Sequence, residues 1–169
     1  MANTYTLIAS STVGAGGASN IEFTSIPSTY TDLKLVTSLR MSSSGQWYTL
    51  KFNNSTSTYS DRYLLGSGSS AASGIDGGQP ALAGSAEDST YTANTFANSE
   101  NYIPNYTSSN YKSYSGDGVQ ENNATASYMA FWANLWSTTS AITSIKIEAQ
   151  GGVNFVQYST AYLYGISNS

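Results

Sequence analysis

The chain of 169 residues carries ten acidic and six basic side chains, a net charge of -4 and a pI near 4.5. It contains no cysteine and no histidine, which excludes disulfides, thiolate nucleophiles, Ser-His-Asp triads and zinc sites built on these residues. Charged residues are 9% of the chain, against about 25% in ordinary domains, and the basic ones are scattered, so we expect no nucleic-acid partner.

Tyrosine is the dominant aromatic residue, with 14 copies, and it favours the half-buried surface of a β-sheet. Ser, Thr, Asn and Gly supply most of the remaining polarity and disfavour long helices. No stretch approaches the ~18 apolar residues of a membrane span, and no basic region precedes an apolar segment. We therefore expect no membrane attachment, no signal peptide and synthesis in a cytoplasm.

Short runs with apolar residues at every second position recur along the first part of the chain, which is typical of half-buried strands. Residues 11–19 form a Gly-rich turn after the first run, and Pro27 ends the second because it cannot donate a ladder hydrogen bond. The predicted strands in this part are 4–9, 21–26, 33–41, 48–52 and 59–65.

Residues 66–89 are rich in Gly, Ala and Ser and hold few large apolar side chains. Such a segment buries too little area to offset its ordering entropy, so we predict a long surface loop. Neither this segment nor 11–19 contains the GxxxxGK[ST] pattern of a phosphate-binding loop.

Strand patterns resume after this segment and continue to the end of the chain. Residues 125–136 are the best helix candidate because of their Ala content, but their aromatic content fits a strand at least as well. The predicted strands in this part are 92–103, 111–120, 128–136, 142–147 and 155–165.

This pattern predicts one all-β domain over residues 1–169, with roughly eight to ten strands. Such chains avoid exposed edges by folding into two packed sheets or a closed barrel. We predict a jelly-roll-like antiparallel β-sandwich.

Carboxylates are the remaining candidates for catalysis. Glu87 and Asp88 are adjacent in the predicted loop, where they would be poorly held. Asp117 and Glu121 flank a predicted turn, and Asp117 lies between two glycines. A glycosidase needs two carboxyl groups fixed across a sugar cleft, so we interpret all four as solvated loop residues and expect no enzyme.

A Ca²⁺ site would need about six to eight oxygen ligands, usually with several carboxylates close together. Asp76 and Asp117 are the nearest candidates, but they are isolated in the sequence. We therefore expect no metal and no cofactor.

The aromatic side chains suggest binding rather than chemistry. Trp132 and Trp136 lie in an apolar run and are expected in the core. Four tyrosines in a polar stretch after Pro104 form a candidate partner interface, because exposed aromatics bring a large contact area at low entropy cost. These residues are Tyr102, Tyr106, Tyr111 and Tyr114.

Three stretches carry a family resemblance. They are YTLIASSTVGAGGASNIEFTSIPSTYTDLKLVTSLR at 5–40, YIPNYTSSNYKSYSGDGVQENNAT at 102–125 and NFVQYSTAYLYGI at 154–166. In this order the chain resembles small virion proteins of tailed bacteriophages. The resemblance implies a β-sandwich with a structural role on the particle and no catalytic residues.

Two functions follow from the resemblance. The first is a capsid decoration or cement protein on the surface of the virion, with the major capsid protein as partner and a homo-oligomer, a trimer, as the assembled form. The alternative is a tail-associated module, with tail proteins as partners, or a module that binds host glycans. In either case the protein is made in the host cytoplasm.

Overall fold

The computed structural model describes residues 4–123 and 127–167, and within these residues it contains twelve β-strands and one short 3-10 turn, η1 (Gln150–Gly152). No helix in this part of the chain is long and apolar enough to cross a membrane. The strands are β1 (Tyr5–Thr12), β2 (Asn20–Phe23), β3 (Asp32–Leu39), β4 (Trp47–Phe52), β5 (Tyr59–Gly66), β6 (Ala71–Gly74), β7 (Leu82–Ser85), β8 (Ala97–Ile103), β9 (Lys112–Gln120), β10 (Tyr128–Trp136), β11 (Ile145–Ala149) and β12 (Thr160–Ile166).

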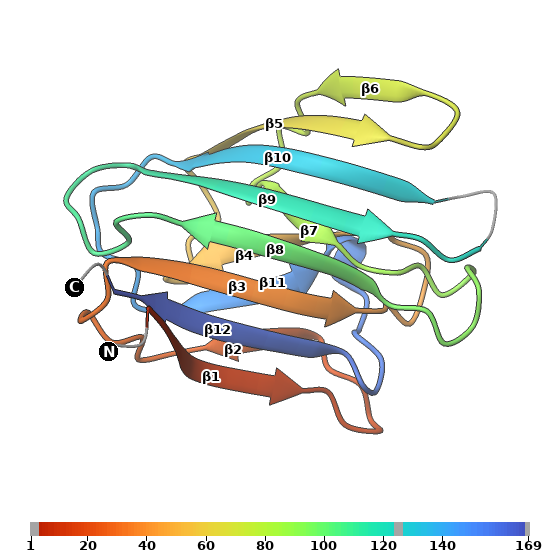
Figure 1. Cartoon of the computed structure of the whole chain (residues 1–169), viewed down its shortest axis with the longest axis horizontal. Coiled ribbons are helices and arrows are strands. Elements are labelled where there is room, and N and C mark those ends of the chain that lie inside the picture. Colours follow the sequence, from red (N-terminus) through yellow and green to blue (C-terminus); the bar gives the residue numbers. More distant parts are fainter. Residues whose placement is uncertain (1–3, 124–126, 168–169) are drawn as a thin grey trace.

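The strands form two antiparallel sheets that pack face to face (Figure 1). The large sheet has eight strands in the order β1-β12-β3-β8-β9-β10-β5-β6, and the small sheet has four in the order β2-β11-β4-β7. The predicted all-β, jelly-roll-like antiparallel sandwich is confirmed. The described residues contain more strands than the predicted eight to ten, because β6 and β7 lie in the segment that was expected to be a loop.

The core lies between the sheets and follows the period-two patterns of the sequence. Along β9, for example, buried and exposed residues alternate without exception. Leu33, Leu35, Leu50, Phe52 and Ile147 are fully buried where the two sheets meet. Burying one such side chain stabilises the fold by ~1.5–3 kcal/mol, so this strip of alternating residues fixes which side of each strand faces inward.

The prediction of a surface loop over 66–89 is wrong for much of that segment. β6 pairs with β5 as an exposed edge strand, whereas every residue of β7 is buried beside β4 in the small sheet. A Cβ atom added at Gly84 would overlap the ring of Tyr48. The small side chains that suggested a loop are therefore what allows β7 to lie close to a large buried ring.

The helix alternative for 125–136 is also settled, except at residues 125 and 126, which lie outside the described residues. Residues 128–136 form β10, and both tryptophans are buried, as predicted. Trp136 packs against Phe52 with the ring centroids 5.6 Å apart and against Tyr59 at 6.3 Å. The aromatic content of this run therefore outweighs its alanines.

Candidate binding surface

Several large apolar side chains are exposed on the outer face of the large sheet. Phe131 lies opposite Leu64 on one side and Asp117 on the other, and Met129 lies opposite Val119. Met129 and Phe131 are 62% and 61% exposed, although β10 is paired with a strand on each side. We call Leu64, Val119, Met129 and Phe131 the apolar patch. Contiguous exposed apolar residues on a sheet mark a binding surface.

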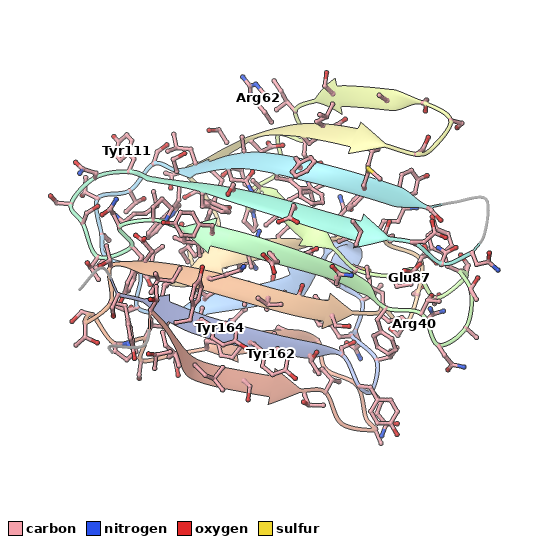
Figure 2. The ribbon with its side chains drawn as sticks, in the orientation of Figure 1. Arg40, Arg62, Glu87, Tyr111, Tyr162 and Tyr164 are labelled. Carbon is pink, nitrogen blue, oxygen red and sulfur yellow. The ribbon has the colours of Figure 1, made fainter. Side chains whose placement is uncertain are left out.

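A second group lies toward the β1 edge of the same face. Tyr162 and Tyr164 lie over β12 (Figure 2), and Tyr164 stands between Leu7 and Lys34 in the register. We call Tyr5, Leu7, Tyr102, Tyr162 and Tyr164 the tyrosine patch. Their rings add area, and their hydroxyl groups provide polar contacts at the rim of an interface.

Hydrogen bonds and charges hold part of this patch in place. Tyr102 Oη donates to Asp32 Oδ2 at 2.7 Å, and this bond, together with burial, raises the pKa of Tyr102 to about 12. Lys34 Nζ lies 2.6 Å from Glu100 Oε2 and 5.9 Å from the centroid of the Tyr5 ring. Tyr102 is therefore neutral at pH 7 and is held in place by its hydrogen bond to Asp32.

Asp117 separates the two patches. Burial raises the pKa of this carboxyl group, and the charge of Glu100 raises it further. The sequence prediction of a turn at Asp117 is wrong, because Asp117 lies within β9 opposite Glu100 and Phe131. Its two flanking glycines point into the core, where their lack of a side chain serves packing rather than a turn.

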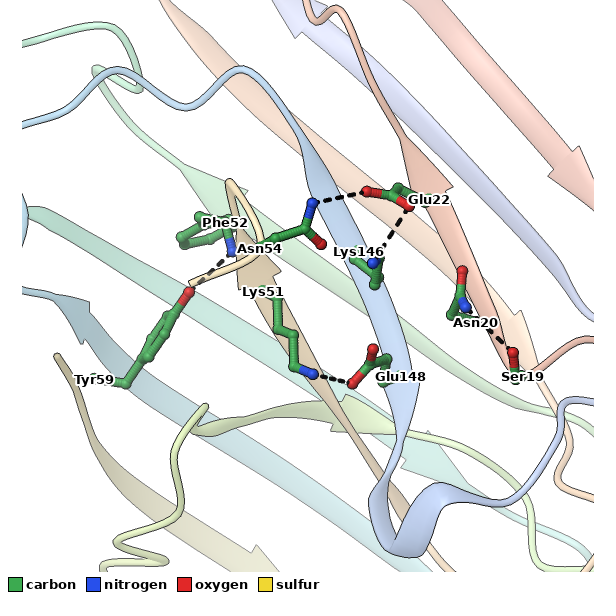
Figure 3. A network of polar contacts seen from close by, with 9 residues as sticks. All are labelled: Ser19, Asn20, Glu22, Lys51, Phe52, Asn54, Tyr59, Lys146 and Glu148. Atoms are coloured by element: carbon green, nitrogen blue, oxygen red, sulfur yellow. Dashed lines mark hydrogen bonds and ion pairs between the residues drawn. The ribbon is translucent and has the colours of Figure 1, made fainter. Parts of the chain in front are cut away.

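The outer face of the small sheet has a different chemistry (Figure 3). Lys51 Nζ lies 2.5 Å from Glu148 Oε2, and Lys146 Nζ lies 3.4 Å from Glu22 Oε2. Paired charges of this kind are well solvated and are depleted from the centres of protein interfaces, where aromatics and Met are enriched. The outer face of the large sheet is therefore the better docking surface of the two.

The structure separates the four tyrosines that the sequence predicts as one interface. Tyr102 and Tyr111 are exposed, at 42% and 59%, whereas Tyr106 and Tyr114 are in the core. Tyr106 donates its hydroxyl hydrogen to the carbonyl of Pro27, and the Tyr114 ring packs edge-on against Phe52 at 5.0 Å. The prediction of Tyr106 and Tyr114 as interface residues is therefore wrong.

The carboxylate pair Glu87 and Asp88 was expected in a poorly held loop, and this expectation is wrong. Both side chains are buried (Figure 2 labels Glu87 beside Arg40). The Arg40 guanidinium donates to the carbonyl oxygens of four residues in the following segment. These acceptors are Ser89, Tyr91, Thr92 and Thr95. Arg40 therefore anchors the chain directly after the pair.

The surroundings shift the pKa values of Glu87 and Asp88 in opposite directions. Burial raises the pKa of Glu87, against the hydrogen bond from Asn122 and the charge of Arg40. Burial also opposes ionisation of Asp88, but hydrogen bonds from Thr90 and Gly45 outweigh it and lower the pKa. Among the described residues, Glu87 Oε2 has no hydrogen-bond partner. Ionised Asp88 therefore stabilises the folded state, whereas ionised Glu87 destabilises it.

Replacing Glu87 with Gln is expected to raise the melting temperature at pH 7. A carboxyl group whose pKa is raised by folding loses stability as pH rises from its ordinary pKa to its folded pKa. The glutamine amide does not titrate in this range. The higher melting temperature of Glu87→Gln relative to the wild type should therefore vanish below pH 4. Melting curves at both pH values measure this, and Asp88→Asn, which should be destabilising at pH 7, is the control. Equal melting temperatures for wild type and Glu87→Gln at pH 7 would contradict it.

The other predicted acidic groups stay apart. Asp117 lies on the outer face of the large sheet, and Asp76 lies in the segment after β6. The part of the chain that the structure describes contains no group of three or more acidic side chains placed to share a metal ion. The candidate binding residues of the described chain are therefore those of the apolar patch and the tyrosine patch on the large sheet.

The sequence interpretation missed Met129, Phe131, Tyr162 and Tyr164 as members of a candidate binding surface. A signal for the first two is present in residues 128–136, where both alternating sets are apolar. One set must face the core, so the other set is exposed or covered by a partner.

Comparison with protein-family models, with curated proteins and with solved structures finds no match for this chain, so the family expected from its sequence stays a prediction.

Proposed function

We propose that the chain is a non-enzymatic structural protein of a tailed-phage virion, most simply a capsid decoration protein that stabilises the head shell. The observation that carries this proposal is the exposed apolar patch of Leu64, Val119, Met129 and Phe131 on the outer face of the large sheet. The family resemblance of the sequence supplies the particle context.

The proposed partner of this surface is the major capsid protein. Met and aromatic residues form the centre of stable interfaces, and polar groups surround them. Here Lys34 lies within the tyrosine patch, between Tyr102 and Tyr164, and pairs with Glu100. Asp117 separates this patch from the apolar patch, and these charges would set the register of docking. A pre-formed sheet surface loses little side-chain entropy on binding.

The presence of many copies on one particle would strengthen the attachment of each protein beyond the affinity of a single contact. Many identical copies on a rigid lattice gain avidity, and a trimer at local threefold positions closes a ring with heterologous contacts. The β1 strand is an edge of the large sheet, so its free side is also open to strand addition from a neighbouring chain. The added buried area would resist the pressure of packaged DNA.

Removing the protein from the particle tests this role. Heads stripped of it are expected to rupture at a lower temperature than intact heads, and adding the purified protein back should restore the original rupture temperature. DNA release followed by a fluorescent dye during heating is the measurement. Unchanged rupture after verified removal would contradict a cement role.

A further inference from the structure

A hollow of about 200 Å³ opens on the inner side of the large sheet, lined mainly by aromatic and aliphatic side chains. It exists because β5 and β6 extend beyond β7, the last strand of the small sheet (Figure 1). Tyr63 and Leu65 are therefore only half-buried, although they point to the same side as the core. Its lining residues are Trp47, Tyr63, Leu65, Asp76, Leu82, Ala130, Trp132 and Gln150.

The walls of the hollow are rigid. Trp47 and Trp132 meet edge to face with ring centroids 5.4 Å apart, and Trp47 meets Tyr128 at 6.0 Å. The buried Asp61 carboxylate accepts the backbone N–H groups of Asp76 and Gly77 at 2.8 and 3.1 Å. This pair of hydrogen bonds fixes the segment that carries Asp76 beside the aromatic wall.

The hollow also presents polar groups beside its apolar walls. The residues that line it include Trp47 and Trp132 with their indole N–H groups, Tyr63 with its hydroxyl group and Gln150 with its side-chain amide. Asp76 Oδ2 accepts one bond, from Gly78 N at 3.0 Å. Donors and acceptors therefore stand next to apolar ring surfaces, which is the combination that orients a small ligand.

A second hollow adjoins the first and shares Asp76, Leu82 and Gln150 with it. Its volume is about 470 Å³, within the range of roughly 300–1,000 Å³ found for small-molecule sites. Asn20, Thr49 and Glu148 add amide, hydroxyl and carboxylate groups. None of the described residues that line either hollow is Lys or Arg, so the charged groups of the lining are the carboxylates of Asp76 and Glu148.

We infer that these two adjoining hollows form a binding site for a neutral saccharide. A pyranose ring has apolar C–H faces, which pack on aromatic rings, and a rim of hydroxyl groups that both donate and accept hydrogen bonds. Trp47 and Tyr63, which are half-buried, supply the accessible ring surface, and buried Trp132 supports Trp47 from behind. Asp76 and Gln150 supply polar partners where the two hollows join.

This inference goes beyond the proposed virion role and does not depend on it. The saccharide site uses Ala130 and Trp132, whereas the apolar patch uses Met129 and Phe131. Successive residues of a strand point to opposite faces. A variant can therefore remove one surface and leave the other intact.

Tryptophan fluorescence tests the site directly, because the chain contains only three tryptophans and two of them line it. In the Trp136→Phe variant, all tryptophan emission comes from Trp47 and Trp132. Titration with galactose, mannose, glucose and their neutral disaccharides is expected to shift this emission with at least one of them. Glucuronic acid and sialic acid are expected to leave it unchanged, because the charged groups that line the site are carboxylates, which repel them.

Matched variants separate binding from folding. Gln150→Ala removes an exposed side chain, and the loss of one hydrogen bond should weaken binding about fivefold. Asp76→Ala should weaken it similarly, whereas Phe131→Ser on the opposite face should bind as the parent does. The inference is overturned if no neutral sugar shifts the emission, if Gln150→Ala and Asp76→Ala both bind as Phe131→Ser does, or if the acidic sugars bind best.

Discussion

Replacing Met129 and Phe131 together with serine is expected to abolish attachment of the protein to stripped phage heads. The two side chains stand in adjacent outward positions of β10 and are each more than half exposed, so the folded monomer gains little from them. Truncating a central aromatic or Met anchor typically costs about 2 kcal/mol or more in binding. Losing both should weaken each contact at least about a hundredfold. Co-sedimentation with the heads measures the bound fraction.

The control lies on the opposite side of the sandwich. Lys51→Ser with Glu148→Ser removes an ion pair from the outer face of the small sheet and should leave attachment unchanged. Both double variants should melt close to the wild type, because surface changes are usually worth within ~0.5 kcal/mol. If the serine pair on β10 binds normally, or if the Lys51 and Glu148 pair loses binding instead, the assignment of the docking face is wrong.

Gly116→Ala is expected to destabilise the fold by about 3 kcal/mol, at the upper end of the range for overpacked cores. A Cβ atom at this position would overlap the carbonyl oxygen of Ala83 and lie 2.5 Å from Asn101 Nδ2. The Ala83 oxygen belongs to β7 and accepts the Asn101 side-chain hydrogen bond at 2.6 Å. Neither group can move without disturbing the contact between the sheets. For a chain of this size the cost corresponds to a melting temperature about 6–12 °C lower.

A matched glycine provides the control for this substitution. An added Cβ atom at Gly14 would meet nothing within 4 Å. Gly14→Ala should therefore melt within about 2 °C of the wild type. Equal melting temperatures for the two alanine variants would show that β7 does not pack tightly against β9, contrary to the structure.

Much of the fold could be predicted because its sequence signals are local. The alternation in 33–41, 48–52 and 128–136 requires only that one side of each strand is buried. The burial of β7 could not be predicted in this way. A run of small side chains by itself predicts a loop. In the fold these residues belong to the core because they lie opposite Tyr48, on a strand more than 30 residues earlier in the chain.

The candidate site was harder to predict than the fold. The grouping of four tyrosines assumed that residues close in sequence share a surface, whereas Tyr106 and Tyr114 turn inward to Pro27 and Phe52. The candidate surface that the structure presents joins side chains from strands at both ends of the sequence, such as Tyr5 and Tyr162. Strand order decides which residues become neighbours, and period-two patterns do not contain it.

The central claim is that this β-sandwich is a structural part of a virion and binds its shell through the outer face of the large sheet. A density map of the intact particle tests it most directly. The proposed function predicts hundreds of copies on the head, each with Met129 and Phe131 covered by the shell protein. A handful of copies on the tail, or copies on the head that leave both side chains in solvent, would contradict it.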